Sequence, residues 1–227
     1  MQGMTLGFFT NPQKQSAVDG LLTGLSSALL QGYSCCVDAS LLPLIPEPLP
    51  TIDQKIPDYI LAFGGDGTIL RAASKAAELG IPILGINLGR VGFLSEITPD
   101  QLQTAFARLE QHAFALDKRM MLACRVNGGS PHYCLNETLL YKRAFSGIVD
   151  ISVEISGVQA GSVMCDGIIV STTTGSTGYS IFAGGCAGIR CCDYHTDLPA
   201  YAFFSPDYRA GRCTNVLFHE QRRVYFP

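Results

Sequence analysis

A single carboxylate, Asp66, stands in the glycine-rich segment Phe63-Gly64-Gly65-Asp66-Gly67-Thr68. Glycines let a backbone approach a pyrophosphate without a Cβ clash, and a helix that begins there offers unpaired N–H donors and the positive end of its dipole. Because two anions repel, Asp66 cannot hold a phosphate by itself; it suits a sugar hydroxyl, whose proton it could accept during phosphoryl transfer. An ordinary Asp-Gly turn is the alternative, but a strand before the segment and a helix after it favour a phosphate or nucleotide site. The expected phosphate loop comprises Gly64, Gly65, Gly67 and Thr68.

Two later segments also carry groups that bind polar ligands. Asn136 and Glu137 lie side by side in a β-rich region, and an amide next to a carboxylate can hold vicinal ribose hydroxyls; an ordinary strand end is the alternative. The other segment begins at Asp166 and reads Asp-Gly-Ile-Ile-Val-Ser-Thr-Thr-Thr-Gly-Ser-Thr-Gly-Tyr-Ser. An apolar strand runs into a loop of hydroxyls and glycines, and Tyr179 can pack on a ring. The apolar run before the loop argues against a mere polar linker.

The elements that must position these segments alternate between strand and helix in the first half of the chain. Short apolar runs predict buried strands at 5–10, 33–37, 58–63 and 81–86. Helical spacing predicts helices at 13–30, 68–79 and 98–110, the second of them ending at Gly80. Five prolines between residues 41 and 57 predict an extended surface connection. This alternation predicts an α/β domain with a parallel sheet, whose site lies at the carboxyl ends of the strands.

The pattern changes near residue 113. Glycine turns without a long helix separate β-rich segments at 120–126, 132–141, 148–156 and 163–170. We therefore expect an α/β domain over 1–112 that carries the glycine-rich segment, and a mostly antiparallel, β-rich domain over 113–185. Residues 186–227 have no lysine, four cysteines and no sustained period of 2 or 3.6. Two interpretations of this tail stay open: a disordered or loosely packed segment, or the product of a shifted reading frame.

Composition limits the classes of partner. Hydrophobic residues make up 47% of the 227 residues and charged residues 15%, which is typical of an ordered globular protein. The net charge of −3 gives no basic field for nucleic acid or an anionic membrane. No apolar run reaches the roughly 20 residues that span a bilayer, and no leader pattern is present, so we expect a cytoplasmic protein. The nine cysteines form no paired CxxC pattern, so neither a zinc site nor metal-ligating residues are expected.

The glycine-rich segment resembles the motif shared by NAD kinases, lipid kinases of the diacylglycerol type and, more loosely, phosphofructokinases. All three segments in this order, together with Gly-Ile-Asn-Leu-Gly-Arg-Val-Gly-Phe-Leu at 85–94, are similar to the NAD kinase family over residues 4 to 185. Lipid kinases lack the third segment. The resemblance implies that ATP or polyphosphate, with Mg²⁺, phosphorylates the 2′-hydroxyl of the adenosine ribose of NAD to give NADP. It also implies a homodimer or homotetramer if the C-terminal region is intact, because further family strands complete the second domain and its oligomer contacts.

Carried over position by position, the resemblance implies roles for single residues. Asp66 is the implied catalytic base, with Gly67 and Arg71 beside the substrate. The remaining residues implied to bind NAD are Asn136 and Glu137, Asp166 near the nicotinamide half, and Thr177, Gly178, Tyr179 and Ser180 on the adenine side.

The chain also departs from the family pattern. Phe182 stands where a serine is usual, which removes one hydroxyl contact to the dinucleotide. The other departures are Thr173 for proline, Gly178 for alanine, Cys186 for proline, and Met164 and Gly147 for polar or basic residues. These departures keep a second interpretation open, a catalytically impaired NAD-binding fragment of the family; a lipid kinase is the third.

Overall fold

The computed structural model describes residues 3–89, 92–143, 147–155, 158–185, 201–205 and 213–225. The chain divides into two compact units, one of residues 1–119 with 221–227 and one of residues 120–220. The boundary expected at residue 112 falls just before β5 (Ala115–Val126), a single strand that continues from the first unit into the second.

The first unit is built on a parallel sheet, as the sequence predicts. Its strands run in the order β2-β1-β3-β4, and every neighbouring pair is parallel. All residues of β1, β3 and β4 are buried, which explains their continuous apolar runs, because helices cover both faces of such a sheet. The chain order reverses between β1 and β3, and this switch point is where open parallel sheets bind ligands. The strands are β1 (Thr5–Thr10), β2 (Ser34–Val37), β3 (Tyr59–Phe63) and β4 (Ile83–Ile86).

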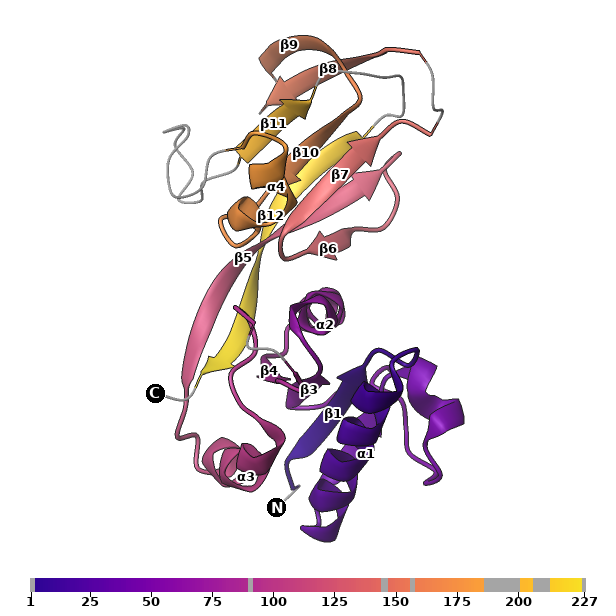
Figure 1. Ribbon diagram of the computed structural model, residues 1–227, viewed down its shortest axis with the longest axis vertical. Helices are drawn as coiled ribbons and strands as arrows, with labels where there is room; N and C mark the ends of the chain where they lie inside the picture. Colours follow the sequence, from indigo (N-terminus) through magenta and orange to yellow (C-terminus); the bar gives the residue numbers. More distant parts are fainter. Residues whose placement is uncertain are drawn as a thin grey trace. The chain divides into compact units, whose positions relative to one another are not determined.

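Helices cover the two faces of this sheet (Figure 1). On one face, Leu25 of α1 and Phe106 of α3 belong to a buried cluster with Phe63. The ring of Phe63 stacks on the ring of Phe8, with 5.8 Å between the ring centres. Ile69 of α2 lies on the other face, against the alternate residues of the strands. The helices are α1 (Gln15–Leu30), α2 (Asp66–Leu79) and α3 (Leu102–Glu110), the last continuing the 3-10 turn η2 (Pro99–Gln101).

The ends of α2 show how the sequence fixes a helix. Gly80 closes it in the left-handed conformation with φ of 69°, so the predicted C-terminal glycine is confirmed. At the other end, α2 begins at Asp66, two positions before the predicted start, because the extended Gly65 acts as its N-cap. The whole turn that carries the candidate carboxylate is therefore helical.

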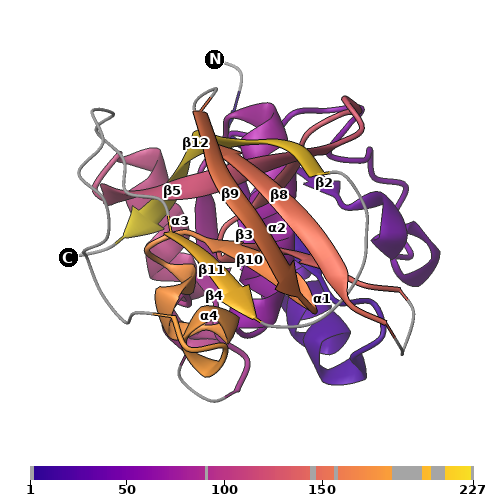
Figure 2. The same cartoon turned by 90° about the horizontal axis from the view of Figure 1, so that it is seen from above.

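The second unit consists mainly of antiparallel strands, as predicted. Its strands form the sheet β11-β10-β7, the long ribbon β8-β9 seen in Figure 2, and the pair β5-β6. Two predicted strands are each divided: a break at 135–136 separates β6 from β7, and a break at Asp166 separates β9 from β10. The strands are β6 (His132–Cys134), β7 (Glu137–Tyr141), β8 (Val149–Ile155), β9 (Val158–Cys165), β10 (Gly167–Ser171) and β11 (Tyr201–Ser205).

The tail contains backbone strands for which the sequence predicts no element. β11 pairs antiparallel with β10 over residues 201–205, where Tyr-Ala-Phe-Phe-Ser suits a strand. Within β12 (Cys213–Tyr225), residue 223 pairs in parallel with residue 83 of β4. Cys186 and the rest of the tail lie outside the described residues. No helix in the described ranges is long and apolar enough to cross a bilayer.

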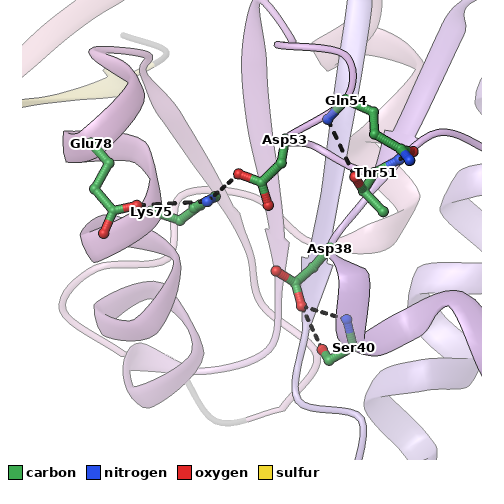
Figure 3. A network of polar contacts seen from close by, with 7 residues as sticks. All are labelled: Asp38, Ser40, Thr51, Asp53, Gln54, Lys75 and Glu78. Atoms are coloured by element: carbon green, nitrogen blue, oxygen red, sulfur yellow. Dashed lines mark hydrogen bonds and ion pairs between the residues drawn. The ribbon is translucent and has the colours of Figure 1, made fainter.

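The connection from residue 41 to 57 is anchored, so the prediction of an extended surface segment is wrong. Its first residues belong to the 3-10 helix η1 (Ala39–Leu44). This helix tolerates Pro43, because the fixed φ of proline is close to the value of a 3-10 helix. Leu41, before the first proline, and Ile52, between the last two, are fully buried. The end of the connection is tied to α2 by an ion pair between Asp53 and Lys75, as Figure 3 shows.

Candidate functional site

The glycine-rich segment forms a corner at the carboxyl edge of the parallel sheet, next to the switch point. Gly64 has φ of 152°, and its amide donates to the carbonyl of Ile86 at the end of β4, at 2.9 Å. A Cβ on Gly64 would lie 2.3 Å from Oγ1 of Thr68. Packing within the corner therefore requires glycine at this position, whether or not a ligand binds.

Gly65 and Gly67 differ from Gly64 because open space surrounds them. Apart from the chain neighbours and the nearby backbone of the helix itself, no atom of the described residues lies within 4 Å of the position that a Cβ would take on either residue. Both are exposed, and Gly65 accepts the amide of Thr68 at 2.9 Å, which starts the helix. The amides of Asp66 and Gly67 come before this first hydrogen bond and have no acceptor within the helix, so they are available to a ligand that approaches over these two glycines.

The carboxylate of Asp66 is held in place by a neighbouring loop. Its Oδ2 accepts the amide of Phe93 at 3.0 Å and its Oδ1 accepts the amide of Leu94 at 3.0 Å. Gly92 lies so close that a Cβ there would be 2.2 Å from Oδ1. Asp66 is the acidic residue of the first turn of α2, where the helix dipole stabilises its charge.

The loop around Asp66 was not among the predicted site residues. Its sequence signal was present, since residues 92–94 end the segment 85–94 that resembles the family. The spacing gave no indication that two amides of this loop converge on one side chain. Arg71, predicted beside the substrate, is exposed on α2 with its guanidinium carbon 5.9 Å from the centre of the Phe9 ring.

In the second unit, the break between β6 and β7 places Asn136 against the hydroxyl-rich loop. The carbonyl of Asn136 accepts the amide of Thr172 at 2.8 Å. Thr172 also donates from Oγ1 to the carbonyl of Leu135 at 2.6 Å and accepts the amide of Gly175 at 3.1 Å. Buried Thr172 thus fixes the loop to the strand end. Sequence reasoning missed it, although it belongs to the run of hydroxyls.

The side chains at this strand end carry buried polar atoms that have no hydrogen-bond partner among the described residues. They are Oδ1 of Asn136, Oε2 of Glu137 and Oγ of Ser180. A Cβ on Gly178 would lie 3.3 Å from Glu137 Oε2 and 3.5 Å from Asn136 Nδ2, so both side chains reach the same glycine. Unpartnered buried polar groups are rare and costly, which points to a ligand as their partner. Burial raises the pKa of the Glu137 carboxyl above its ordinary value.

The remaining predicted residues of this unit lie in two places. Asp166 sits in the break between β9 and β10, where its Oδ1 lies 2.8 Å from Nζ of Lys142. The Lys142 side chain is only 9% exposed, so this is a largely buried ion pair. Thr177 and Tyr179 are exposed on the short turns that follow the hydroxyl-rich loop. Phe182 is 86% exposed, so its ring takes no part in the core.

The described residues thus bring the predicted groups together in two clusters. In the first unit, Asp66 and the open glycines share one corner of the sheet. In the second, Asn136 and Glu137 meet Gly178, whereas Asp166 pairs with Lys142. Within the described ranges, no group of three or more His, Cys, Asp or Glu side chains is arranged to hold a metal ion.

Comparison with known proteins gives a consistent result. Residues 47–114 match the model of the ATP-NAD kinase N-terminal domain, and residues 135–187 match that of the C-terminal domain. An NAD kinase of Gemmatimonas aurantiaca is 36% identical over 73% of this chain and 59% of its own length. An NAD kinase of Corynebacterium diphtheriae is 45% identical over 60% of this chain and 44% of its own. The chain therefore matches about half the length of these relatives.

Two solved structures have the same fold. The yeast NADH kinase complexed with NADH superposes with a TM-score of 0.66 and 16% identity, over 99% of this chain and 84% of that one. An NAD kinase from Archaeoglobus fulgidus in complex with ATP gives a TM-score of 0.62 and 20% identity, over 99% of this chain and 94% of that one. The predicted fold class, an α/β domain followed by a mostly antiparallel β domain, is confirmed.

Proposed function

Because the chain belongs to the NAD kinase family, we propose that it transfers a phosphoryl group to the 2′-hydroxyl of the adenosine ribose of NAD, forming NADP. The observation that carries the proposal is the corner of the parallel sheet. It combines one carboxylate, two glycines with open space beside them and the start of a helix at the switch point. This combination suits phosphoryl transfer, in which a protein mainly positions the reactants and neutralises charge.

In the proposed reaction Asp66 is the general base. Its carboxylate accepts the proton of the 2′-hydroxyl as that oxygen forms a bond to the terminal phosphorus of the donor. The bond from this phosphorus to the bridging oxygen breaks, and ADP or the shortened polyphosphate leaves with that oxygen. Each carboxylate oxygen accepts one amide and keeps capacity for a second hydrogen bond, so both amides can stay in place while the base works. General-base assistance of this kind contributes about 10²–10⁴-fold to the rate.

The phosphate loop supplies the groups that receive negative charge. Gly65 and Gly67 let phosphate oxygens come close to the backbone, and the amides at the start of α2 stabilise charge there. The donor is proposed to be ATP or polyphosphate carrying Mg²⁺ as part of the substrate. The single carboxylate of the corner does not provide a resident metal site, so no step is assigned to a protein-bound ion.

The second unit is proposed to recognise the dinucleotide. Asn136 and Glu137 offer an amide and a carboxylate with unpartnered oxygens, a combination that suits the hydroxyls of a ribose. Thr177, Gly178, Tyr179 and buried Ser180 follow on the adenine side, and Asp166, held by Lys142, is proposed to contact the nicotinamide half.

A catalytically impaired, NAD-binding fragment is the second candidate. Its specific support is exposed Phe182, which stands in place of a serine, so that one hydroxyl contact to the dinucleotide is lost. A lipid kinase shares only the glycine-rich segment and gains no support from the comparisons.

Turnover and binding assays separate these candidates. We expect the full chain to form NADP from NAD and MgATP, and Asp66→Asn and Asp66→Ala to lose NADP formation while circular dichroism stays unchanged. Calorimetry with NAD runs beside the turnover assay. NAD binding without product in the unaltered chain would favour the fragment, and near-normal turnover of either Asp66 variant would remove the base assignment.

The finer properties are proposals of the same kind. A homodimer or homotetramer is proposed from the family, and the choice between ATP and polyphosphate rests with the turnover assay. The cytoplasm is proposed as the compartment. Among the described residues, Cys35, Cys36, Cys134 and Cys165 are free thiols, which suits a reducing environment.

A further inference from the structure

The contact between Asp66 and the loop at residues 92–94 is unusually close. The amides of Phe93 and Leu94 bind one oxygen each, both at 3.0 Å. A Cβ on Gly92 would lie 2.2 Å from Oδ1 and 2.7 Å from Cγ, both far inside van der Waals contact. The clash involves the tip of a side chain whose two oxygens are already bound, so the carboxylate could not move without losing its amide partners.

Backbone conformation does not explain the glycine. Gly92 is not among the glycines with positive φ, so alanine could adopt its backbone angles. Gly89, earlier in the same loop, has open space around its Cβ position. The three atoms nearest to the Cβ position of Gly92 all belong to the carboxylate of Asp66, so this carboxylate is the first obstacle to a side chain at position 92.

We propose that Gly92 is a positioning residue for the reaction: by leaving room for the carboxylate, it lets the amides of Phe93 and Leu94 fix the direction in which Asp66 presents its oxygens. The inference rests on the proposed function, because it assigns the orientation of the proposed base. Free rotation about the Asp66 side chain would spread its oxygens over several directions, and two amides 3.0 Å away select one. Gly92 acts through Asp66 and does not itself contact the substrate.

The kinetic expectation for Gly92→Ala is a loss of rate with little change in binding. A shift of about 1 Å in a reacting group costs on the order of 10²-fold, so kcat should fall by roughly 10- to 100-fold. Because the carboxylate contributes mainly in the transition state, KM for NAD should change by less than about threefold. Gly89→Ala is the matched control, the same substitution in the same loop with open space around it, and should keep both constants.

A second measurement tests the contact without any turnover. Thermal unfolding is compared for Gly92→Ala, Asp66→Ala and the double variant. In the unaltered background Gly92→Ala should lower Tm by several degrees, about what a 1–2 kcal/mol change produces in a chain of this size. In the Asp66→Ala background the obstructing carboxylate is gone, so the same substitution should lower Tm by less than about 1 °C.

The two measurements keep the inference and the proposed function apart. If Gly92→Ala lowers Tm equally in the unaltered chain and in the Asp66→Ala variant, the contact between Gly92 and the Asp66 carboxylate is refuted. A Gly92→Ala enzyme with normal kcat would refute the role of Gly92 in positioning Asp66. If the unaltered chain forms no NADP, the proposed function fails and the catalytic role of Gly92 fails with it. The Tm comparison then still decides whether Gly92 makes room for the Asp66 carboxylate.

Discussion

Replacement of Gly67 by alanine should make the protein more stable and less active. Gly67 is the second residue of α2, and outside its own turn of the helix no atom of the described chain lies within 4 Å of the position of an added Cβ. Glycine in a helix is less stable than alanine by roughly 0.5–1 kcal/mol, because the unfolded chain has more freedom to lose. For a domain of this size that gain corresponds to an increase in Tm of about 1–4 °C.

The same methyl group should impair the reaction. It would occupy the open side of the first turn, where the donor phosphates are proposed to approach the amides. A phosphate held about 1 Å further out loses alignment with its acceptor, which costs on the order of 10²-fold. We therefore expect kcat/KM for MgATP to fall at least about tenfold while Tm rises.

Differential scanning fluorimetry and a coupled NADP assay on the same preparations measure both effects. Ser74→Ala provides the matched control, because it raises the helix propensity of α2 away from the glycine-rich corner. It should raise Tm slightly with unchanged turnover, which separates a stiffer helix from a blocked approach. A Gly67→Ala enzyme with normal kcat/KM would refute the assignment of this glycine to the phosphate loop. A lower Tm of the same variant would show that the added methyl group meets a neighbouring atom.

Two further outcomes follow from the same glycines and from the buried carboxyl. Gly64→Ala should lower Tm by several degrees with or without ligand, since its Cβ would lie 2.3 Å from Thr68 Oγ1 at a φ of 152°; an unchanged Tm in thermal denaturation would contradict this. Burial raises the pKa of Glu137 in the folded state above its ordinary 4.5, so the stability that the protonated carboxyl contributes is present below that pH and lost as pH rises through the folded value. Glu137→Gln should therefore unfold at a higher temperature than the unaltered protein at pH 7, and this difference in Tm should close toward pH 4. The variant should also bind NAD more weakly by calorimetry. A difference in Tm that grows toward low pH would contradict the raised pKa of Glu137.

The sequence predicted best where local physics decides the outcome. The strand at 5–10 has the predicted bounds, and Gly80 ends α2 because a left-handed residue closes a helix most easily as glycine. The alternation of elements also predicts a parallel sheet with its site at the carboxyl ends of the strands, and the glycine-rich segment follows a strand directly. The position of Asp66 at the carboxyl edge of the sheet could therefore be inferred before any coordinates.

What the sequence did not predict depends on contacts between distant segments. The amides of Phe93 and Leu94 reach Asp66 across 27 and 28 residues, and backbone donors have no sequence signature. The connection at 41–57 was judged from its prolines, but its apolar residues Leu41 and Ile52 decide its place because they are buried. Thr172 was counted as one hydroxyl of many, although its hydrogen bonds to Leu135 and Gly175 hold the loop to the strand.

Two groups of glycines near the candidate site differ in what surrounds them. Gly64, Gly167 and Gly175 lack side chains because an added Cβ would lie 2.3 Å from an atom of the fold itself. Gly65 and Gly67 have no such neighbour among the described residues, and at Gly67, inside the first turn of α2, alanine would stabilise the helix. The approach of the donor phosphates to this turn is the proposed reason for a glycine at Gly67. The unpartnered oxygens at the end of β7 also point to a ligand, because their burial costs stability that no described residue offsets. Both features reduce the stability of the ligand-free protein, and both occur where the proposed substrates would bind.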